Sequence, residues 1–437
     1  MIQKSKTGDY KKERGHFIMH KMPTALLIIL LLLPLPGCHD INEIDDLVYV
    51  ISLGLDKGSH DNIKTTVQFT SLKEGGDQET GGGKKSSTSE KGKEGFDILS
   101  VEAPTVFGAL NLLNTSLTRR LTFMHLKIIV FSEDLAGEGL SPYLGILAGY
   151  SDLRRPITVL VARSGAENFI NNNISIIGTN PSKTIELITR QSESTGFYSR
   201  FTDRDFYSNI KSTYIQPIAI LAGVNSPKAG ASPQTGIIYN QTAGDIGIKG
   251  DLKRNTMGTA VFDGDKMVGE LNGDETRVLL MARGEFKRAF MDVRDPQNPK
   301  RFINFDVRPA RKPKIKTWFE DGKPFVHLTL NIEANWAIAQ TAASYADPEL
   351  LPIAENALKE YIREILDEII KKSQHEFNSD IFGFGRFMAA HFLTIQEWEG
   401  YEWPEKFKDA HIATEVAVNI RRPGISIYLS PVRKAGE

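Results

Sequence analysis

The sequence predicts an α+β protein of more than one domain, in which mixed sheets pack against helices. In the first half, short apolar strands alternate with helical patterns, which is typical of a mixed α/β layer structure. In the second half, a β-rich stretch precedes the clearest amphipathic helix of the chain, over residues 349–372. The chain has 437 residues. A length of this order predicts two or three domains.

The first half begins with a β-rich run at residues 47–53, and residues 63–70 are expected to pair back on it as a hairpin. Residues 73–95 contain mainly Gly, Ser, Lys and Glu, which predicts a flexible surface loop. The remaining pattern predicts helices over 104–117, 140–150, 182–192 and 203–210, and strands over 125–131, 157–162 and 214–224.

The second half follows a stretch rich in Gly, Pro, Ser, Thr and Asn, residues 225–256, which predicts a linker. Asp263-Gly264-Asp265 indicates a hairpin between strands 259–262 and 266–270. The further elements expected are strands over 283–290, 301–309, 325–334 and 411–420, and helices over 349–372 and 385–392. The predicted organisation is a leader 1–37, an N-terminal α/β domain 38–224, the linker, a β-rich middle domain 257–310 and a C-terminal α+β domain 311–437.

The single cysteine, Cys38, follows Leu35-Pro36-Gly37 at the end of a short apolar segment. A basic region containing Lys11, Lys12, Arg14 and Lys21 comes first, and the apolar run then extends over residues 25–33. A helix that spans a bilayer needs roughly 20 residues, so this run is interpreted as the apolar part of an export signal. A small residue before the cysteine and an aliphatic one three before it are typical of bacterial lipoprotein processing. We expect cleavage between Gly37 and Cys38, with diacylglycerol on the Cys38 thiol.

Two alternatives to this interpretation stay open. One is a plain secretory signal that is cut elsewhere, with Cys38 incidental. Pro36 stands where a small residue is usual, and proline fixes φ and removes an N–H. The other alternative concerns the first residue of the protein, because Met19 or Met22 could begin a shorter signal.

The charge balance argues against nucleic acid as a partner. Without residues 1–37, 47 basic and 52 acidic residues remain, a formal charge of −5. A nucleic-acid surface needs clustered Lys and Arg. An acidic chain is also not attracted to a membrane electrostatically, so attachment depends on the lipid. If Cys38 is lipidated, no thiol remains for a disulfide, and apolar cores must hold the protein.

Motifs for catalysis or cofactor binding are incomplete in this sequence. Residues 178–184 (Gly-Thr-Asn-Pro-Ser-Lys-Thr) lack the second glycine of a phosphate-binding loop, so a helix start at Pro181 is the better interpretation. Residues 382–385 (Phe-Gly-Phe-Gly) lack the third glycine of a dinucleotide motif, and aromatic packing at a helix entrance is favoured. His375-Glu376 has no second histidine one turn later, and there is no Gly-x-Ser-x-Gly. The sequence therefore predicts no enzyme, no cofactor and no metal.

Two charged clusters are more simply interpreted as solvated. Glu43, Asp45 and Asp46 could bind a cation but fit a polar stem. The basic residues between Arg308 and Lys316 could face lipid headgroups but fit a solvated linker between strands.

A series of short segments after residue 36 extends over almost the whole remaining chain. They are Gly37-Cys38-His39-Asp40, Glu43-Ile44, Gly54-Leu55-Asp56, Ser116–Arg120, His125–Lys127, Arg154–Pro156, Gly258–Phe262, Asp265-Lys266, Val268-Gly269, Glu275–Arg277 and Ser379–Gly385. In these segments and in their order, the sequence resembles the Ger(x)C family, the lipoprotein C subunits of spore nutrient-germinant receptors. One departure is His39, where the family often has Trp.

The resemblance implies a three-domain α+β protein on the outer face of the spore inner membrane. It implies two partners, a multi-spanning A subunit and a permease-like B subunit, which respond with it to nutrients and start germination. An anchored, acidic body without a catalytic motif fits such an assembly role.

Two other classes remain as alternatives. A lipoprotein solute-binding component of a transporter would need two similar α/β lobes around a hinge, whereas the halves here are unlike. A surface hydrolase would need a nucleophile or metal constellation that the sequence does not display.

Overall fold

The computed structural model describes residues 46–70, 96–149, 153, 156–173, 181–225, 238–339 and 349–422. Apart from Asp46, these residues belong to one compact unit, Leu47–Glu437. The predicted leader with Gly37 and Cys38, the predicted loop 73–95 and much of the predicted linker lie outside the described residues, so these predictions stay as they are.

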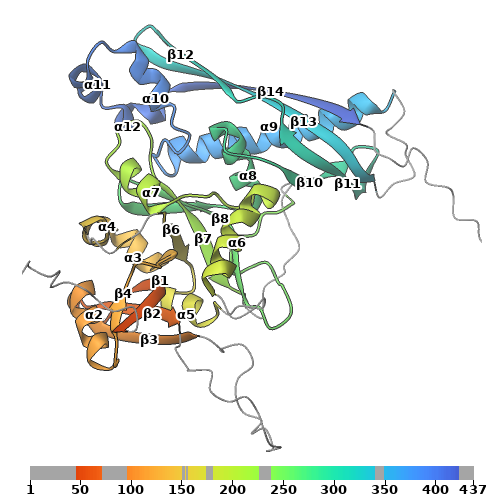
Figure 1. Cartoon of the computed structure of the whole chain (residues 1–437). Coiled ribbons are helices and arrows are strands. Elements are labelled where there is room, and N and C mark those ends of the chain that lie inside the picture. The colour runs from red at the N-terminus through yellow and green to blue at the C-terminus, as the bar shows by residue number, and fades with distance from the viewer. Residues whose placement is uncertain are drawn as a thin grey trace, which may run out of the picture. The chain divides into compact units, whose positions relative to one another are not determined.

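The first sheet contains nine of the described strands, with α/β connections (Figure 1). They are β1 (Leu47–Lys57), β2 (Ile63–Thr70), β3 (Phe96–Ala103), β4 (Arg120–Thr122), β5 (Ile128–Ser132), β6 (Thr158–Ala162), β7 (Ile218–Val224), β8 (Arg254–Asp263) and β9 (Lys266–Leu271). The order is β3-β2-β1-β5-β6-β7-β8-β9, with β4 beside β1. The central strands β1, β5, β6 and β7 are parallel, and antiparallel hairpins flank them.

Helices cover both faces of this sheet, which explains why its parallel strands are apolar without alternation. On β5, Ile129 and Phe131 belong to one apolar core, while Ile128 and Val130 belong to another. The first core includes residues of α2 (Val106–Thr115), α3 (Glu133–Glu138), α4 (Ser141–Gly149) and α7 (Asp203–Ile210). The second includes α5 (Ala166–Asn171) and the partly buried Ile188 of α6 (Pro181–Thr195).

The second sheet contains five of the described strands. They are β10 (Ala289–Asp295), β11 (Asn298–Pro309), β12 (Lys314–Glu320), β13 (Lys323–Ala339) and β14 (His411–Arg422). All pairs are antiparallel except β13–β14. The long helix α9 (Leu351–His375) runs along this sheet and contacts β14 (Figure 1). Short helices precede β14, namely α10 (Gly385–Met388), η2 (Ala389–His391), α11 (Ile395–Tyr401), α12 (Trp403–Lys406) and η3 (Phe407–Asp409).

Helix α8 (Gly273–Arg283) joins the two sheets through a shared apolar core. Every residue from Gly273 to Ala282 is buried. Its apolar residues share a core with Ile218 and Val261 of the first sheet and with Leu328 of the second. The sequence did not predict this helix, because a helix buried on all sides has no polar face and hence no amphipathic period.

The predicted fold class, α+β with mixed sheets and a helix-bearing C-terminal part, is confirmed. Residues 349–372 form most of α9, and residues 203–210 form α7. The hairpin around Gly264 is also present, with φ +58° at that glycine. Its strands belong to the first sheet. The division into three domains stays a prediction.

One prediction was wrong, and another was right only in part. The strand expected over 283–290 is replaced by the end of α8 and by β10, which starts only at Ala289. The predicted linker between Arg308 and Lys316 is short, because Arg308 lies on β11 and Lys314 already begins β12. In β12 the charged Lys314 and Lys316 alternate with the partly buried Ile315 and Thr317, which is the period of an edge strand.

Candidate functional site

The predicted processing site, Gly37 and Cys38, lies outside the described residues and stays a prediction. Of the predicted acidic stem, Asp46 is described, and it is exposed. Among the described residues, no group of three or more His, Cys, Asp or Glu side chains could hold a metal ion. Over the same residues, no helix is long and apolar enough to cross a membrane.

The helix start predicted at Pro181 is confirmed, since α6 begins there. Aromatic packing at residues 382–385 is confirmed as well. The rings of Phe382 and Phe384 stack with centroids 5.0 Å apart and are buried, and α10 begins at Gly385. A Cβ on Gly385 would lie 2.7 Å from the Trp403 ring, so this position needs glycine.

Asp380 organises this segment from inside the protein. It is 3% exposed, and its carboxylate accepts hydrogen bonds from the backbone N–H groups of Gly383, Phe384 and Gly385 and from the Trp403 indole, at 2.8–3.2 Å. The backbone carbonyl of Asp380 accepts a hydrogen bond from the N–H of Gln216, which lies just before β7 of the first sheet. These bonds hold a loop in place; they leave no oxygen of Asp380 directed at solvent.

A second buried polar network surrounds α8. Arg277 is 3% exposed, lies 3.1 Å from the Asp274 carboxylate, and covers the Phe197 ring at 3.6 Å. Asp274 also accepts a hydrogen bond of 2.6 Å from the Tyr361 hydroxyl of α9. Burial, followed by the Asp274 charge, raises the pKa of Tyr361. The network connects α8 to α9, and Arg277, Asp274 and Tyr361 are hydrogen-bonded within it.

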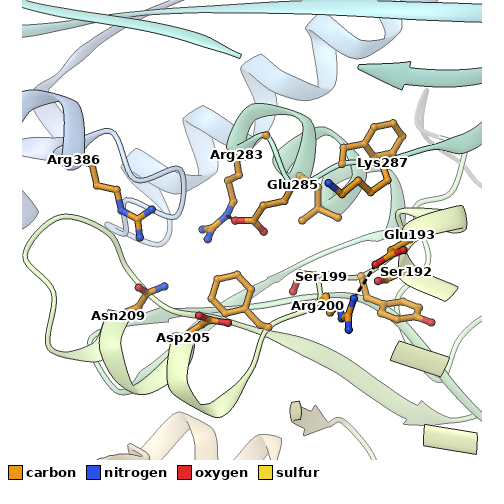
Figure 2. Close-up of a pocket in the computed structure, with 15 residues that line it drawn as sticks. Ser192, Glu193, Ser199, Arg200, Asp205, Asn209, Arg283, Glu285, Lys287 and Arg386 are labelled. Atoms are coloured by element: carbon orange, nitrogen blue, oxygen red, sulfur yellow. Dashed lines mark hydrogen bonds and ion pairs between the residues drawn. The ribbon is translucent and has the colours of Figure 1, made fainter. Parts of the chain in front are cut away.

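A cleft of about 470 Å³ lies among the described residues, and its volume falls in the range of small-molecule sites. Figure 2 shows Arg283, Glu285 and Arg386 on one side and Asp205 and Asn209 on the other. The remaining lining comes from Ser192, Glu193, Tyr198, Ser199, Arg200, Phe201, Leu280, Gly284, Phe286 and Lys287.

The charges in the cleft largely neutralise one another. Arg283 pairs with Glu285 at 2.8 Å, and Arg200 pairs with Glu193 at 2.9 Å. Asp205 belongs to the capping box that starts α7. The lining contains serines but no histidine or cysteine, so no Ser–His or Cys–His pair lies in this part of the described chain.

Four exposed apolar side chains lie on β12 and on the segment that packs against it, and together we call them the apolar patch. Phe319 lies on β12, and Phe387, Leu393 and Ile395 lie on the segment that packs against it. The exposed fractions are 37%, 43%, 94% and 62%, in that order. The two parts are held together by the Phe319 ring against Tyr401, 5.6 Å between centroids, and by a hydrogen bond from Thr317 to the Phe387 carbonyl.

Sequence reasoning missed this patch. Its signal was the alternating run of β12, which was interpreted as part of a linker, and the apolar Phe392-Leu393 pair before a short helix. Exposed apolar clusters on a folded protein mark interaction surfaces. Of the described surfaces, the apolar patch is therefore the best candidate for a functional contact.

The chain was then compared with known proteins. Residues 40–223 match the family described as "Spore germination protein N-terminal domain", and residues 257–424 match "Spore germination B3/ GerAC like, C-terminal". These matches place the chain in the class of spore germination proteins. It belongs to the GerAC/B3-like family, which confirms the resemblance found in the sequence.

Individual relatives from Bacillus subtilis (strain 168) match along nearly their whole length. Spore germination protein KC is 24% identical, with 93% of this chain and 97% of the relative covered. Spore germination protein YndF is 21% identical, covering 93% and 98%. Spore germination protein B3 is 23% identical, covering 90% and 96%. The crystal structure of the GerBC protein resembles this chain with a TM-score of 0.45 and 16% identity, over 84% of this chain and 96% of the other.

Proposed function

We propose that this spore germination protein is the lipid-anchored subunit of a nutrient germinant receptor. It works through contacts with a multi-spanning A subunit and a permease-like B subunit, on the outer face of the spore inner membrane. The observation that carries the proposal is the single Cys38 behind a short apolar segment, followed by family matches that begin at residue 40.

The anchor follows from simple energetics. Each acyl CH₂ group that enters the bilayer contributes about 0.8 kcal/mol, and two chains hold a protein stably where one chain is marginal. A diacylglycerol on Cys38 supplies two chains. Since the chain after Gly37 has a formal charge of −5, attachment rests on the lipid rather than on charge.

The contact function is supported by the apolar patch. A side chain as exposed as Leu393, at 94%, gives no stability to the isolated fold, whereas burial against a partner would remove apolar area from water. Phe319 and Ile395 beside it enlarge that area. We therefore assign the patch to contact with the multi-spanning partners.

The alternative, a solute-binding component of a transporter, gains less support. That class closes two similar lobes around a ligand. Here the first sheet has a parallel centre with helices on both faces, while the second is mostly antiparallel. The cleft lies beside α7 and α8, and its charged side chains are mostly paired within the protein.

Replacement of the anchor residue tests the proposal. We expect Cys38→Ala to move the protein from the spore membrane fraction to the soluble fraction and to weaken nutrient-triggered germination several-fold. Fractionation with immunoblotting measures the first effect, and loss of optical density after nutrient addition measures the second. A Pro36→Ala variant, which keeps the cysteine, is the control. Full membrane retention together with normal germination of Cys38→Ala would refute the anchor.

A further inference from the structure

Arg254 carries a positive charge into the interior of the first sheet. It is the first residue of β8 and pairs with Val224 of β7. The residue is only 8% exposed, and it lines a pocket on the face of the sheet where α5 and α6 lie. Apolar side chains such as Leu160, Phe169 and Ile220 surround it there.

No described residue neutralises this charge. The Arg254 side chain makes no hydrogen bond or ion pair within the described part of the chain, and its Nε atom is buried without a partner. Residues 174–185 and 226–237, whose side chains are not described, contain no Asp or Glu. Burial lowers the pKa of Arg254 to about 10, so the guanidinium is still charged at neutral pH.

Such a charge is expensive to leave alone. A buried ion without a partner strongly destabilises a folded protein, even after relaxation. The other deeply buried arginine follows the expected rule, because Arg277 pairs with Asp274 at 3.1 Å and covers the Phe197 ring. The difference between Arg254 and Arg277 indicates that the partner of Arg254 is not one of the described residues, so the guanidinium is open to a bound ion.

The pocket at Arg254 limits what that partner can be. Its volume is about 20 Å³. A cavity needs roughly 10–15 Å³ to hold one water molecule, so there is room for one ion or one small group. Thr158 and Thr256 also line it, and threonine hydroxyls can turn to donate to an anion.

We propose that this pocket binds a small monovalent anion, held by the Arg254 guanidinium. Two sources share the required chemistry: a free halide ion, or a carboxylate as small as formate, which enters the pocket whole. A divalent or bulky anion does not fit. This inference is independent of the membrane anchor and of the receptor partners.

Thermal unfolding of the full chain in detergent, followed by tryptophan fluorescence, tests the proposal. The probes are sodium bromide and sodium formate, each compared with sodium gluconate at equal ionic strength, because gluconate is too large for the pocket. A ligand that binds only the folded state raises Tm in a saturable way, and we expect a rise of about 2 °C or more. A rise with bromide alone assigns a halide site, a rise with formate alone assigns a carboxylate site, and a rise with both assigns a site that accepts either.

Two variants separate the pocket from general salt effects. Arg254→Met keeps the length of the side chain and removes the charge, so the difference between bromide or formate and gluconate should vanish. Arg190→Met is the matched control, because Arg190 is an exposed arginine on α6, 61% accessible and paired with Glu186. It should respond like the unaltered protein.

The proposal is overturned if gluconate, bromide and formate act alike on the unaltered protein, or if Arg254→Met keeps the same response. Should Arg254→Met fail to fold, crystals of the unaltered protein soaked in bromide or in formate decide. An anomalous bromide peak, or density for formate, in contact with the guanidinium supports the site. The proposal is refuted if neither ion lies there at saturating concentration.

Discussion

At the scale of single residues, Asp306 shows how the second sheet depends on charge. Arg288 donates two hydrogen bonds to its carboxylate, at 2.6 and 3.0 Å, and Arg308 donates a third at 3.1 Å. Burial by itself would raise the pKa of Asp306, but the two arginines outweigh burial and lower the pKa. The carboxylate is therefore stabilised in its charged form in the folded protein.

The sign of the pH effect follows from this lowered pKa. A carboxyl whose pKa is lower in the folded state stabilises the protein above its unfolded pKa and loses that contribution as the pH falls through the folded value. Asp306→Asn should lower the free energy of unfolding by about 1 kcal/mol at pH 7, since both arginines are partly exposed and solvent screens them. Near pH 3, below the ordinary value of 3.8 for the carboxyl, the difference from the unaltered protein should shrink, because the unfolded chain then takes up the proton and ionisation favours the folded state less. Urea unfolding at both pH values measures it.

The exposed Asp97 on β3 offers a control, and Asp97→Asn should change stability little at either pH. An equal effect of Asp306→Asn at pH 7 and pH 3 would contradict the assigned role of charge.

Residues of the segments that carried the family resemblance prove to be internal ties. Asp56 accepts from the backbone N–H groups of Ala166 and Glu167 at 2.7 and 2.8 Å, Arg277 is buried against Asp274, and Asp380 holds the loop before α10. The sequence revealed which residues belong to the family pattern. It did not reveal these partners, which are up to 111 positions away in the chain.

Arg254 was not predictable at all. An arginine at the start of a strand has the same local sequence whether it faces water or a core. Its side chain becomes buried only when β5, β6, β7 and β8 have assembled into one sheet and α6 lies over that face.

At the scale of elements, α8 carries the connection between the sheets and depends on its N-terminal cap. The Asn272 side chain accepts from the Glu275 N–H at 3.0 Å, and the Glu275 carboxylate accepts from the Asn272 N–H at 2.8 Å. Glu275 also forms an ion pair with Lys372 of α9. This reciprocal pair, followed by an apolar run and by Gly284 at φ +71°, was the readable signal for the helix that the periodicity lacked.

Removal of the N-terminal cap should destabilise α8 and the connection that it makes between the two sheets. We expect Asn272→Ala to lower the free energy of unfolding by about 1 kcal/mol, because one first-turn N–H loses its acceptor. Asn272→Ser keeps an acceptor at the cap and should stay close to the unaltered protein. Chemical denaturation compares the two, and an alanine variant as stable as the serine variant would contradict the cap's role.

Elements with one clear face were the most predictable. The pattern of α9 placed it within a few residues of its observed bounds, because one stripe of Ala354, Leu358, Ile362 and Ile369 faces the core. Strand β12 was missed for the opposite reason. The alternation of β12 covers only Lys314 to Thr317, and both its lysines and its aromatic residues are exposed, so the contrast between its two faces is weak.

At the scale of the whole molecule, the proposed function combines a lipid anchor at Cys38 with the apolar patch, which contacts partner proteins. The apolar patch is built from β12 and from residues 387–395, which are about 70 residues away in the chain, and Phe319 and Thr317 of β12 contact the segment that includes α11. Its exposure in the folded chain is the physical reason to expect a partner there.

The patch makes a prediction that is separate from the anchor. Leu393→Asp leaves the core unchanged, because Leu393 is 94% exposed, and it places a charge where burial is expected. The variant should stay at the membrane but lose most of its recovery of the partner subunits. Asp409→Asn, an exposed change in the same part of the chain, is the matched control and should behave like the unaltered protein.

The most direct measurement of the central claim is a crosslinked pull-down of this chain from spore membranes, with the recovered proteins identified by mass spectrometry. The account predicts that two multi-spanning proteins are recovered with the unaltered chain and that Leu393→Asp reduces both at least several-fold. Recovery of no multi-spanning protein from membranes that contain the chain would contradict the account.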